Sequence, residues 1–371
     1  MICCHYIQKG CLFKKPSFPS HILIRLLTNS LSRTLSIFPP LAGRFVTDSD
    51  GYIFITSNDA GVDFIHATAT ELSVADLLSA IDVPHYFKEL FPYHWKISYD
   101  AHFSSIMAVQ VTELADGVFI DFRRENILVS NAVLQLPEDE IKVTFNYEEP
   151  LRERIFSFSY DSIQKLKARV NQRLLTENDN GHCFFEILSF QSLCALVWRA
   201  VTRARKLPET KTTTFRMAVN IRNRIEPKLS DSYFGNAIQG IATRAVAGDM
   251  LLKDMRWCAE QLNNNVKAHD STMVRRELED WERDPKCFAL RNRDGATIQM
   301  GSLPRFSMYE NDFGWGKPVA VRSGGGNKFD GKMSAFTGRE GSGAVDLEVI
   351  LAPETMVGIE NDPEFMFYVS S

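Results

Sequence analysis

Two hydrophobic periodicities alternate along this chain, and they restrict its fold to a mixture of helices and sheets. Apolar residues recur every three or four positions from residue 23 to 38, which is the spacing of one helix face, and Pro39 ends that pattern. Strand-like alternation follows at 51–56. It returns at 107–114 and 117–122, two runs joined by a hairpin signal. The first part of the chain therefore predicts a lobe of mixed helix and sheet.

The regular pattern fails after Asp121 and resumes as a strand at 154–159. A helix pattern then begins near Asp161, and another begins at Ser189. Ser189 is expected to cap its helix, as Ser20 is expected to cap the first one, because a serine hydroxyl can accept a bond from a free backbone N–H. Further strands and helices continue to the end of the sequence, without an internal repeat.

The length of 371 residues favours two lobes, because single cores rarely grow beyond about 250–300 residues. We expect an incomplete N-terminal lobe at 1–122, a linker or crossover at 123–151 and a C-terminal lobe at 152–371. The expected fold class is α/β, with mixed sheets flanked by helices in both lobes.

Composition excludes several classes of protein. The 42 basic and 46 acidic residues leave a net charge of −4, which favours neither nucleic acid nor anionic lipid as a partner. The seven cysteines form no C-x-x-C pair, so we expect free thiols in a reducing compartment and no metal site. No window approaches the roughly 20 apolar residues of a membrane span, and the start lacks the features of a signal peptide. A soluble, cytoplasmic protein is the expectation.

Three short motifs resemble functional motifs but have simpler explanations. Asp312-Phe313-Gly314 matches the metal-binding triplet of protein kinases, but the V-A-I-K, H-R-D and Gly-rich elements that must precede it do not occur. Two glycine-rich stretches, 323–332 and 338–343, lie between alternating apolar runs and are interpreted as hairpin loops, not phosphate loops. A kinase and a phosphate-loop protein are therefore not supported.

The eight histidines offer no obvious catalytic base. His85 precedes Glu89 by four positions, and His182 precedes Glu186 in the same way, so each pair would share one helix face. Chance gives about that number of pairs, and we interpret both as ordinary histidines. The absence of G-x-S-x-G also removes support for a serine nucleophile elbow.

Five segments in a fixed order carry a family resemblance. They are FPPLAGRF (38–45), AVQVTELADGVFI (108–120), SFQSLCALVWRAVTRAR (189–205), AVNIRNRIEPKL (218–229, followed by YFGNAI) and PRFSMYENDFGWGKP (304–318). Together they resemble the plant BAHD acyl-CoA-dependent acyltransferases, the HxxxD-type acyltransferase family. The series runs through almost the whole chain, and DFGWG in this context is highly specific.

The resemblance implies a two-lobed CoA-dependent acyltransferase fold with a channel between the lobes. It implies a monomeric transferase of groups other than aminoacyl groups, which moves an acyl group from acyl-CoA to the hydroxyl or amine of a plant metabolite. Acyl-CoA is then a co-substrate, and no permanently bound cofactor is implied. In the family, the histidine of H-x-x-x-D removes the acceptor's proton as it attacks the thioester, which is general-base catalysis. The aspartate of that motif is a structural partner, usually paired to an arginine.

The same resemblance assigns DFGWG, residues Asp312, Phe313, Gly314, Trp315 and Gly316, a structural role in the channel wall. The two glycines permit backbone angles that other residues resist, and Trp315 offers an apolar anchor. Asp312 can hold an arginine or backbone amides.

This sequence departs from the family where the catalytic histidine should be. The motif should follow the strand that ends at Ile120, yet no histidine occurs between His102 and His182. The chain is a few dozen residues short at this joint and also lacks the family's opening strand and helix. These gaps suggest a truncated or alternatively spliced product, or a faulty gene model, rather than drift by point changes. We therefore predict no catalytic histidine in this chain and impaired activity.

Other candidate residues follow from the resemblance. Many members carry a threonine that can bond the developing oxyanion; the matching stretch here begins at Gly301, so Ser302 and Arg305 are the possible channel or oxyanion-side residues. Asn220, Arg222 and Arg224 are possible lobe-junction residues, and one of these arginines is expected to have lost its aspartate partner.

Two alternatives remain open at this stage. The chain is either an impaired acyltransferase, or a non-catalytic binding protein or histidine-independent lyase on the same scaffold, since positioning alone can lower a barrier. A third outcome is a chain whose first lobe does not fold. Phe87, Phe91 and Trp95 either line the acceptor end of the channel or pack in the core.

Overall fold

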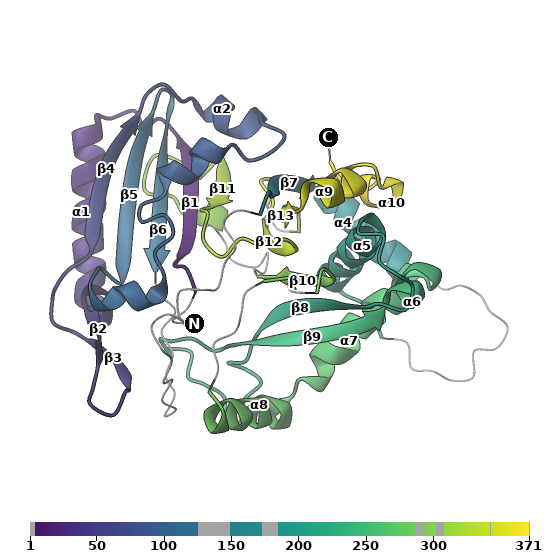
Figure 1. Ribbon diagram of the computed structural model, residues 1–371. Helices are drawn as coiled ribbons and strands as arrows, with labels where there is room; N and C mark the ends of the chain where they lie inside the picture. The colour runs from purple at the N-terminus through teal and green to yellow at the C-terminus, as the bar shows by residue number, and fades with distance from the viewer. Residues whose placement is uncertain are drawn as a thin grey trace.

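The computed structural model describes the chain in seven ranges: 4–124, 149–172, 185–285, 291–292, 294–301, 308–341 and 343–370. Within these ranges it forms two mixed sheets with helices packed against them, as Figure 1 shows. The expected α/β class is thus confirmed. A small two-stranded hairpin extends from the first lobe.

The first sheet has five strands in the order β11-β1-β6-β5-β4. Its strands are β1 (Ile7–Lys14), β4 (Asp63–Ala69), β5 (Met107–Leu114), β6 (Gly117–Arg124) and β11 (Ala320–Ser323), and the hairpin is formed by β2 (Arg44–Thr47) and β3 (Ile53–Thr56). Only the β4–β5 pair is parallel. The predicted hairpin between β5 and β6 is confirmed, with Glu113 opposite Val118 next to the turn.

The second sheet has six strands in the order β7-β13-β12-β10-β8-β9. They are β7 (Arg152–Phe158), β8 (Thr212–Asn220), β9 (Ile238–Val246), β10 (Thr297–Met300), β12 (Lys332–Thr337) and β13 (Val345–Leu351). β10 pairs in parallel with β8 and β12, and the other neighbours are antiparallel. The glycine-rich stretch 338–343 joins β12 to β13, so its interpretation as a hairpin loop is confirmed.

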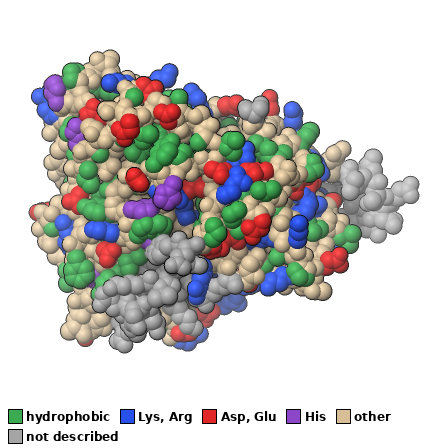
Figure 2. Space-filling model, turned by 45° about the horizontal axis from the view of Figure 1, so that its top comes forward, with side chains coloured by type: hydrophobic (Ala, Val, Ile, Leu, Met, Phe, Trp, Pro, Cys, Tyr) green, Lys and Arg blue, Asp and Glu red, His purple; other side chains and the backbone are tan. Residues whose placement is uncertain are grey.

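Helices cover both sheets. The described α-helices are α1 (Ser20–Ile37), α2 (Val74–Ser79), α4 (Tyr160–Asn171), α5 (Ser189–Ala204), α6 (Ala247–Leu252), α7 (Met255–Ala268), α8 (Ser271–Arg283), α9 (Pro353–Glu360) and α10 (Pro363–Met366). Short 3-10 turns are η1 (Pro39–Ala42), η2 (His85–Leu90), η3 (Ser98–His102) and η4 (Met308–Glu310). None of the helices in these ranges is both long enough and apolar enough to cross a membrane. Figure 2 shows acidic and basic side chains interspersed over the face it presents.

The core follows the predicted apolar face in α5 but only part of the one predicted for α1. In α5, all twelve residues from Gln191 to Thr202 are buried, because the helix contacts other helices on several sides. In α1, only Leu23 and Leu27 are buried, and the other residues of this helix are partly or fully exposed. Phe87 and Phe91 are buried with Phe119, which confirms their core role, whereas Trp95 remains 43% exposed.

The two lobes do not divide the chain at a single point. β11 pairs with β1 in the first sheet, although it lies within the range 152–371 that was expected to form the second lobe. The glycine-rich stretch 323–332 therefore connects a strand of one sheet to a strand of the other, so its interpretation as a hairpin loop is wrong. The alternating pattern on both sides of a loop does not reveal which partner each strand takes.

The predictions that Ser20 and Ser189 cap their helices are also wrong. The N-caps of α1 and α5 are Pro19 and Leu188, and neither makes a side-chain capping bond. The Ser20 hydroxyl instead donates to the carboxylate of Glu113. Each serine lies one residue inside its helix, where its hydroxyl no longer takes the capping position.

Phe119 should be a measurable support of the first lobe. Its ring lies directly over Gly10, where an added Cβ would come within 2.0 Å of it, and its centroid is 5.2 Å from those of Phe87 and Phe91. We expect Phe119→Ala to lower the free energy of unfolding by about 3–5 kcal/mol, because a buried aromatic ring leaves a cavity. Urea unfolding measures this, with the half-exposed Phe54→Ala as a control expected within about 0.5 kcal/mol of wild type. Equal losses in the two variants would show that the first lobe is not packed as described.

Candidate active site

A cavity of about 860 Å³ opens between the helices of the second lobe and the turn η4. Its wall includes residues of α4, α5, the end of β8, η4 and the β12–β13 loop, for example Ile163, Leu193, Val219, Asn220, Tyr309 and Ala344. Tyr309 belongs to the apolar cluster of the first lobe, so the cavity lies where the two lobes meet. A volume of this size suits a small-molecule ligand.

The polar groups on this wall supply charge and hydrogen bonds. Lys167, Asn220, Arg224 and Glu310 lie among largely apolar neighbours. No histidine is among the lining residues of the described ranges. The described wall can therefore bind and orient a ligand, but it presents no imidazole that would act as a base near neutral pH.

The predicted lobe-junction residues are found at or next to this cavity. Asn220 ends β8, and its Oδ1 accepts a bond of 3.0 Å from the backbone N–H of Arg222. Arg222 donates from Nη2 to the carbonyl of Gly235 at 2.7 Å. Arg224 lines the cavity and donates from Nη1 to the carbonyls of Val266 and His269, both at 2.7 Å.

These contacts show that both arginines have hydrogen-bond partners, so neither is unpaired. Arg224 satisfies carbonyls at the C-terminal end of α7, where a cation also interacts favourably with the helix dipole. Arg222 is held by a loop carbonyl. Backbone acceptors, which sequence patterns do not show, take the place of a carboxylate.

The DFGWG stretch forms a tight turn between η4 and β11. Asp312 accepts bonds through Oδ1 from the backbone N–H groups of Gly314 at 2.8 Å and Gly316 at 3.0 Å. These amide bonds lower the pKa of Asp312 below its usual value. Gly314 and Gly316 have φ of 104° and 117°, a region that disfavours side chains.

The aromatic residues of the turn pack on the first lobe. The rings of Phe313 and Trp315 stack with centroids 5.7 Å apart, and Phe13 of β1 contacts both. Phe18 meets Trp315 edge-on at 5.9 Å. The turn therefore attaches the chain to the first sheet just before β11 begins.

The oxyanion-side candidates Ser302 and Arg305 lie outside the described residues. Their neighbour Gly301 is described, and its backbone N–H donates to the carbonyl of Met333 at 2.8 Å. An added Cβ at Gly301 would lie 2.0 Å from Nζ of Lys332. This position therefore accommodates a lysine ammonium group that a larger residue would displace.

The histidines near the lobe junction are structural. His5 is buried, and its Nδ1 accepts a 3.1 Å bond from the backbone N–H of Asn327. Burial, with a smaller effect of His94, lowers the pKa of His5 to about 4, so it is neutral at physiological pH. His85 begins η2, and His182 lies outside the described residues.

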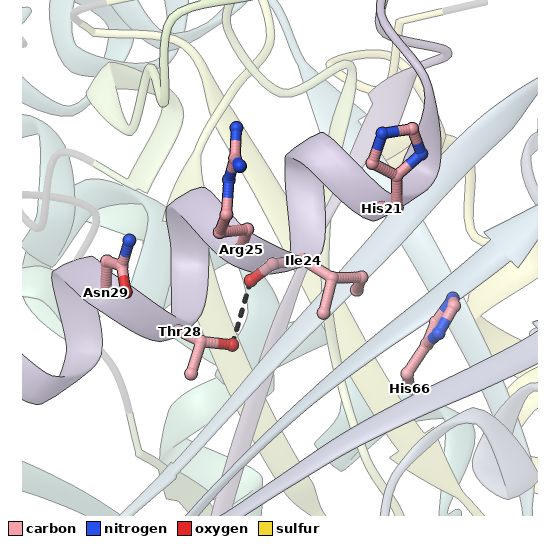
Figure 3. A pocket seen from close by; sticks show the side chains of 6 residues that line it. All are labelled: His21, Ile24, Arg25, Thr28, Asn29 and His66. Atoms are coloured by element: carbon pink, nitrogen blue, oxygen red, sulfur yellow. Dashed lines mark hydrogen bonds between the residues drawn. The ribbon is translucent and has the colours of Figure 1, made fainter.

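A second, shallower cavity of about 410 Å³ lies on α1, with His21, Arg25 and His66 on its wall (Figure 3). Next to it, His66 Nε2 is 2.6 Å from Glu113 Oε1, and the Ser20 hydroxyl donates to the same carboxylate. The acid thus stands between the serine and the histidine. Because His66 does not contact the hydroxyl, this cluster is not a catalytic triad.

Sequence analysis missed a group of charges inside the junction. Glu153, Lys328 and Glu348 have side chains at most 8% exposed and form ion pairs with one another. For Glu153 and Glu348 the one signal was a charged residue at an inward position of an otherwise apolar strand pattern. Lys328 lies between β11 and β12 and gave no such signal. Among the described residues, no three potential ligands gather as a metal site.

The fold can be compared with solved structures. F. sporotrichioides TRI101, solved with Coenzyme A and T-2, superimposes with a TM-score of 0.77 over 100% of this chain and 96% of that one, at 17% identity. The arrangement of sheets and helices in this chain is therefore the fold of TRI101.

The sequence comparisons give the family. The model described as Transferase family matches residues 1–122 and 120–366. An uncharacterized acetyltransferase of Arabidopsis thaliana is 31% identical over 97% of this chain and 90% of its own length. BAHD acyltransferase DCR of the same plant is 30% identical over 98% of this chain and 85% of its own length. The chain belongs to the BAHD acyltransferase family.

The backbone conformation of the DFGWG turn predicts the effect of a substitution at Gly316. An added Cβ at Gly316 would meet nothing within 4 Å, so Gly316→Ala tests the φ of 117° without a steric clash. We expect a loss of about 1–3 kcal/mol in the free energy of unfolding. Gly240→Ala is the matched control, since Gly240 also faces open space but has no positive φ. Urea titration compares the two, and a Gly316→Ala variant as stable as Gly240→Ala would contradict the strained turn.

Proposed function

We propose that this chain binds an acyl-CoA and a small-molecule hydroxyl or amine acceptor in the 860 Å³ cavity, and that it transfers the acyl group slowly because it lacks the family's catalytic histidine. One observation carries the proposal. The family match consists of two stretches that meet at residues 120–122, where the H-x-x-x-D motif is expected.

The alignment to the Arabidopsis acetyltransferase supports an internal gap. It extends over 417 positions, whereas this chain has 371 residues, so at least 46 positions have no counterpart here. Taken together, these positions have room for a catalytic loop and a following helix. This count uses only positions inside the alignment and does not include the ends of the chain.

The chemistry explains why the gap matters. An alcohol has a very high pKa, so its proton must leave as oxygen attacks the thioester carbonyl. A positioned general base contributes about 10²–10⁴-fold to such a step. Binding and orientation of a ligand do not need the base, so the cavity can still bind a ligand even where turnover is slow.

The other candidate residues take supporting roles in this proposal. The DFGWG turn, Asp312–Gly316, is structural, because its contacts run to backbone amides and to the aromatic rings of β1 and the β1–α1 segment. Asn220, Arg222 and Arg224 hold the lobe junction. Ser302 and Arg305 stay candidates for the oxyanion side. TRI101 was solved with both Coenzyme A and a small molecule, which supports the pairing of a CoA and a small acceptor. We further propose a cytoplasmic monomer.

Restoration of the missing segment tests catalysis. The unmatched segment of the Arabidopsis acetyltransferase would be inserted after Asp121, and release of free CoA thiol would be measured with a panel of acyl-CoAs and alcohols. We expect the restored protein to turn over about 10²–10⁴-fold faster than this chain. Replacement of its motif histidine by alanine is the control and should return the slow rate. Equal rates for all three proteins would contradict the proposal.

Obstruction of the cavity tests binding separately. Ala218 lines the cavity from β8, so Ala218→Phe places a ring in the space available to a ligand. We expect CoA to raise the melting temperature of wild type and not that of Ala218→Phe. Thr212→Phe, on the exposed start of the same strand, is the control and should respond as wild type does. A response that Ala218→Phe retains in full would place the CoA site elsewhere.

A further inference from the structure

A group of charged side chains is enclosed where the two sheets meet, away from the lining of the large cavity. Lys328 pairs with Glu153 and lies 3.6 Å from Glu348. The Ser323 hydroxyl donates to the Glu348 carboxylate, with 2.6 Å between Oγ and Oε2. Burial would raise the pKa of Glu348, but Lys328 and Lys9 hold it at about 2. These groups satisfy one another.

Two further lysines in this region have no such partner. Lys9 belongs to β1 of the first sheet and Lys332 to β12 of the second. Neither ammonium group makes a hydrogen bond or ion pair with any residue that the structure describes. Nζ of Lys9 lies 4.2 Å from the centre of the Phe336 ring. Nζ of Lys332 lies in the space beside Gly301.

Both amines are enclosed by the protein but remain partly accessible to solvent. Lys9 and Lys332 each keep part of their surface accessible. Burial lowers the pKa of Lys9 to about 8, with Glu348 opposing the change and Lys332 adding to it. Burial also lowers the pKa of Lys332 to about 8, against the attraction of Glu348 and Cys4. At neutral pH both amines are therefore still mostly protonated.

Several charged groups interact in this region. Ammonium groups of Lys9, Lys88 and Lys328 interact with the carboxylates of Glu153 and Glu348, and that of Lys332 interacts with Glu348 and the thiol of Cys4. Nearby, burial lowers the pKa of His5 and His94, which keeps them neutral, and Arg322 faces Tyr309 and Asp346. A buried cation without a counter-ion is costly, and enclosed charges are normally paired.

We propose that Lys9 and Lys332 form a site for an oxyanion, the carboxylate or phosphate group of a small ligand, at the junction of the two lobes. Each ammonium group has three N–H donors, and each comes from a different sheet, so one anion would link the lobes. Gly301 keeps the approach to Lys332 open, because any side chain there would meet its ammonium group. This inference does not depend on acyl transfer.

Amine reactivity in the wild-type protein tests the site directly. Trace acetylation with acetic anhydride, followed by mass spectrometry over a range of pH, gives the titration midpoint of each lysine. In chloride we expect midpoints near 8 for Lys9 and Lys332. The exposed Lys14 is the control, whose midpoint the added anions should not move. Inorganic phosphate or acetate at equal ionic strength should raise the first two midpoints by about one unit, because a bound anion favours the charged amine.

The two anions distinguish the ligand classes. A response to phosphate alone indicates a phosphate group, a response to acetate alone indicates a carboxylate, and a response to both indicates a general oxyanion site; each supports the proposal. Midpoints of Lys9 and Lys332 that neither anion moves overturn it. This measurement needs no variant and therefore does not depend on whether a substituted chain folds.

Variants give a second readout. At pH 7 we expect the effective anion to raise the melting temperature of wild type and of Lys14→Met by about 2–4 °C, but not that of Lys332→Met or Lys9→Met. The effect should vanish in wild type above pH 9, where both amines have lost their protons. Gly301→Ala should weaken it by displacing the Lys332 ammonium group. A Lys332→Met protein that responds as wild type does would also overturn the site.

Discussion

The pairing of β1 with β11 is the constraint on which the rest of the structure depends. β11 is only four residues long, yet it brings the chain back to the first sheet after the second sheet has begun. The next strand, β12, already belongs to the second sheet. The lobes are thus joined by backbone hydrogen bonds as well as by side-chain packing. The DFGWG turn directly precedes this return, and its aromatic contacts with Phe13 set the point at which the chain re-enters the sheet.

The enclosed charges at the junction act together with this crossing. Glu153 and Glu348 come from neighbouring strands of the second sheet, and Lys328 comes from the stretch that links the sheets. Buried ion pairs contribute little net stability, because desolvation offsets their attraction, but removal of one partner is costly. Such a cluster therefore favours one relative placement of the two sheets more than it strengthens either. Lys9 and Lys332 add positive charge to the same place, which makes an anion the natural complement.

The family fold and its junction cavity are present, while the described wall of that cavity holds no histidine. Arg222 and Arg224 both donate hydrogen bonds to backbone carbonyls. The packing of the two sheets does not require a histidine in this wall, since a catalytic base contributes to a reaction and not to the packing of the sheets.

The sequence by itself determined what depends on neighbours along the chain. The helix predicted over residues 20–38 is observed at Ser20–Ile37, and the hairpin of β5 and β6 forms where its turn signal lies, because periodicity and turn chemistry are local. Ordered motifs also indicated the BAHD family. The tertiary structure alone decided the return of β11 to the first sheet, the bond of Ser20 to Glu113 and the ion pair of Lys328 with Glu153. These depend on partners about 90 to 320 positions away in the sequence, and the alternating pattern of a strand is the same whichever sheet it joins.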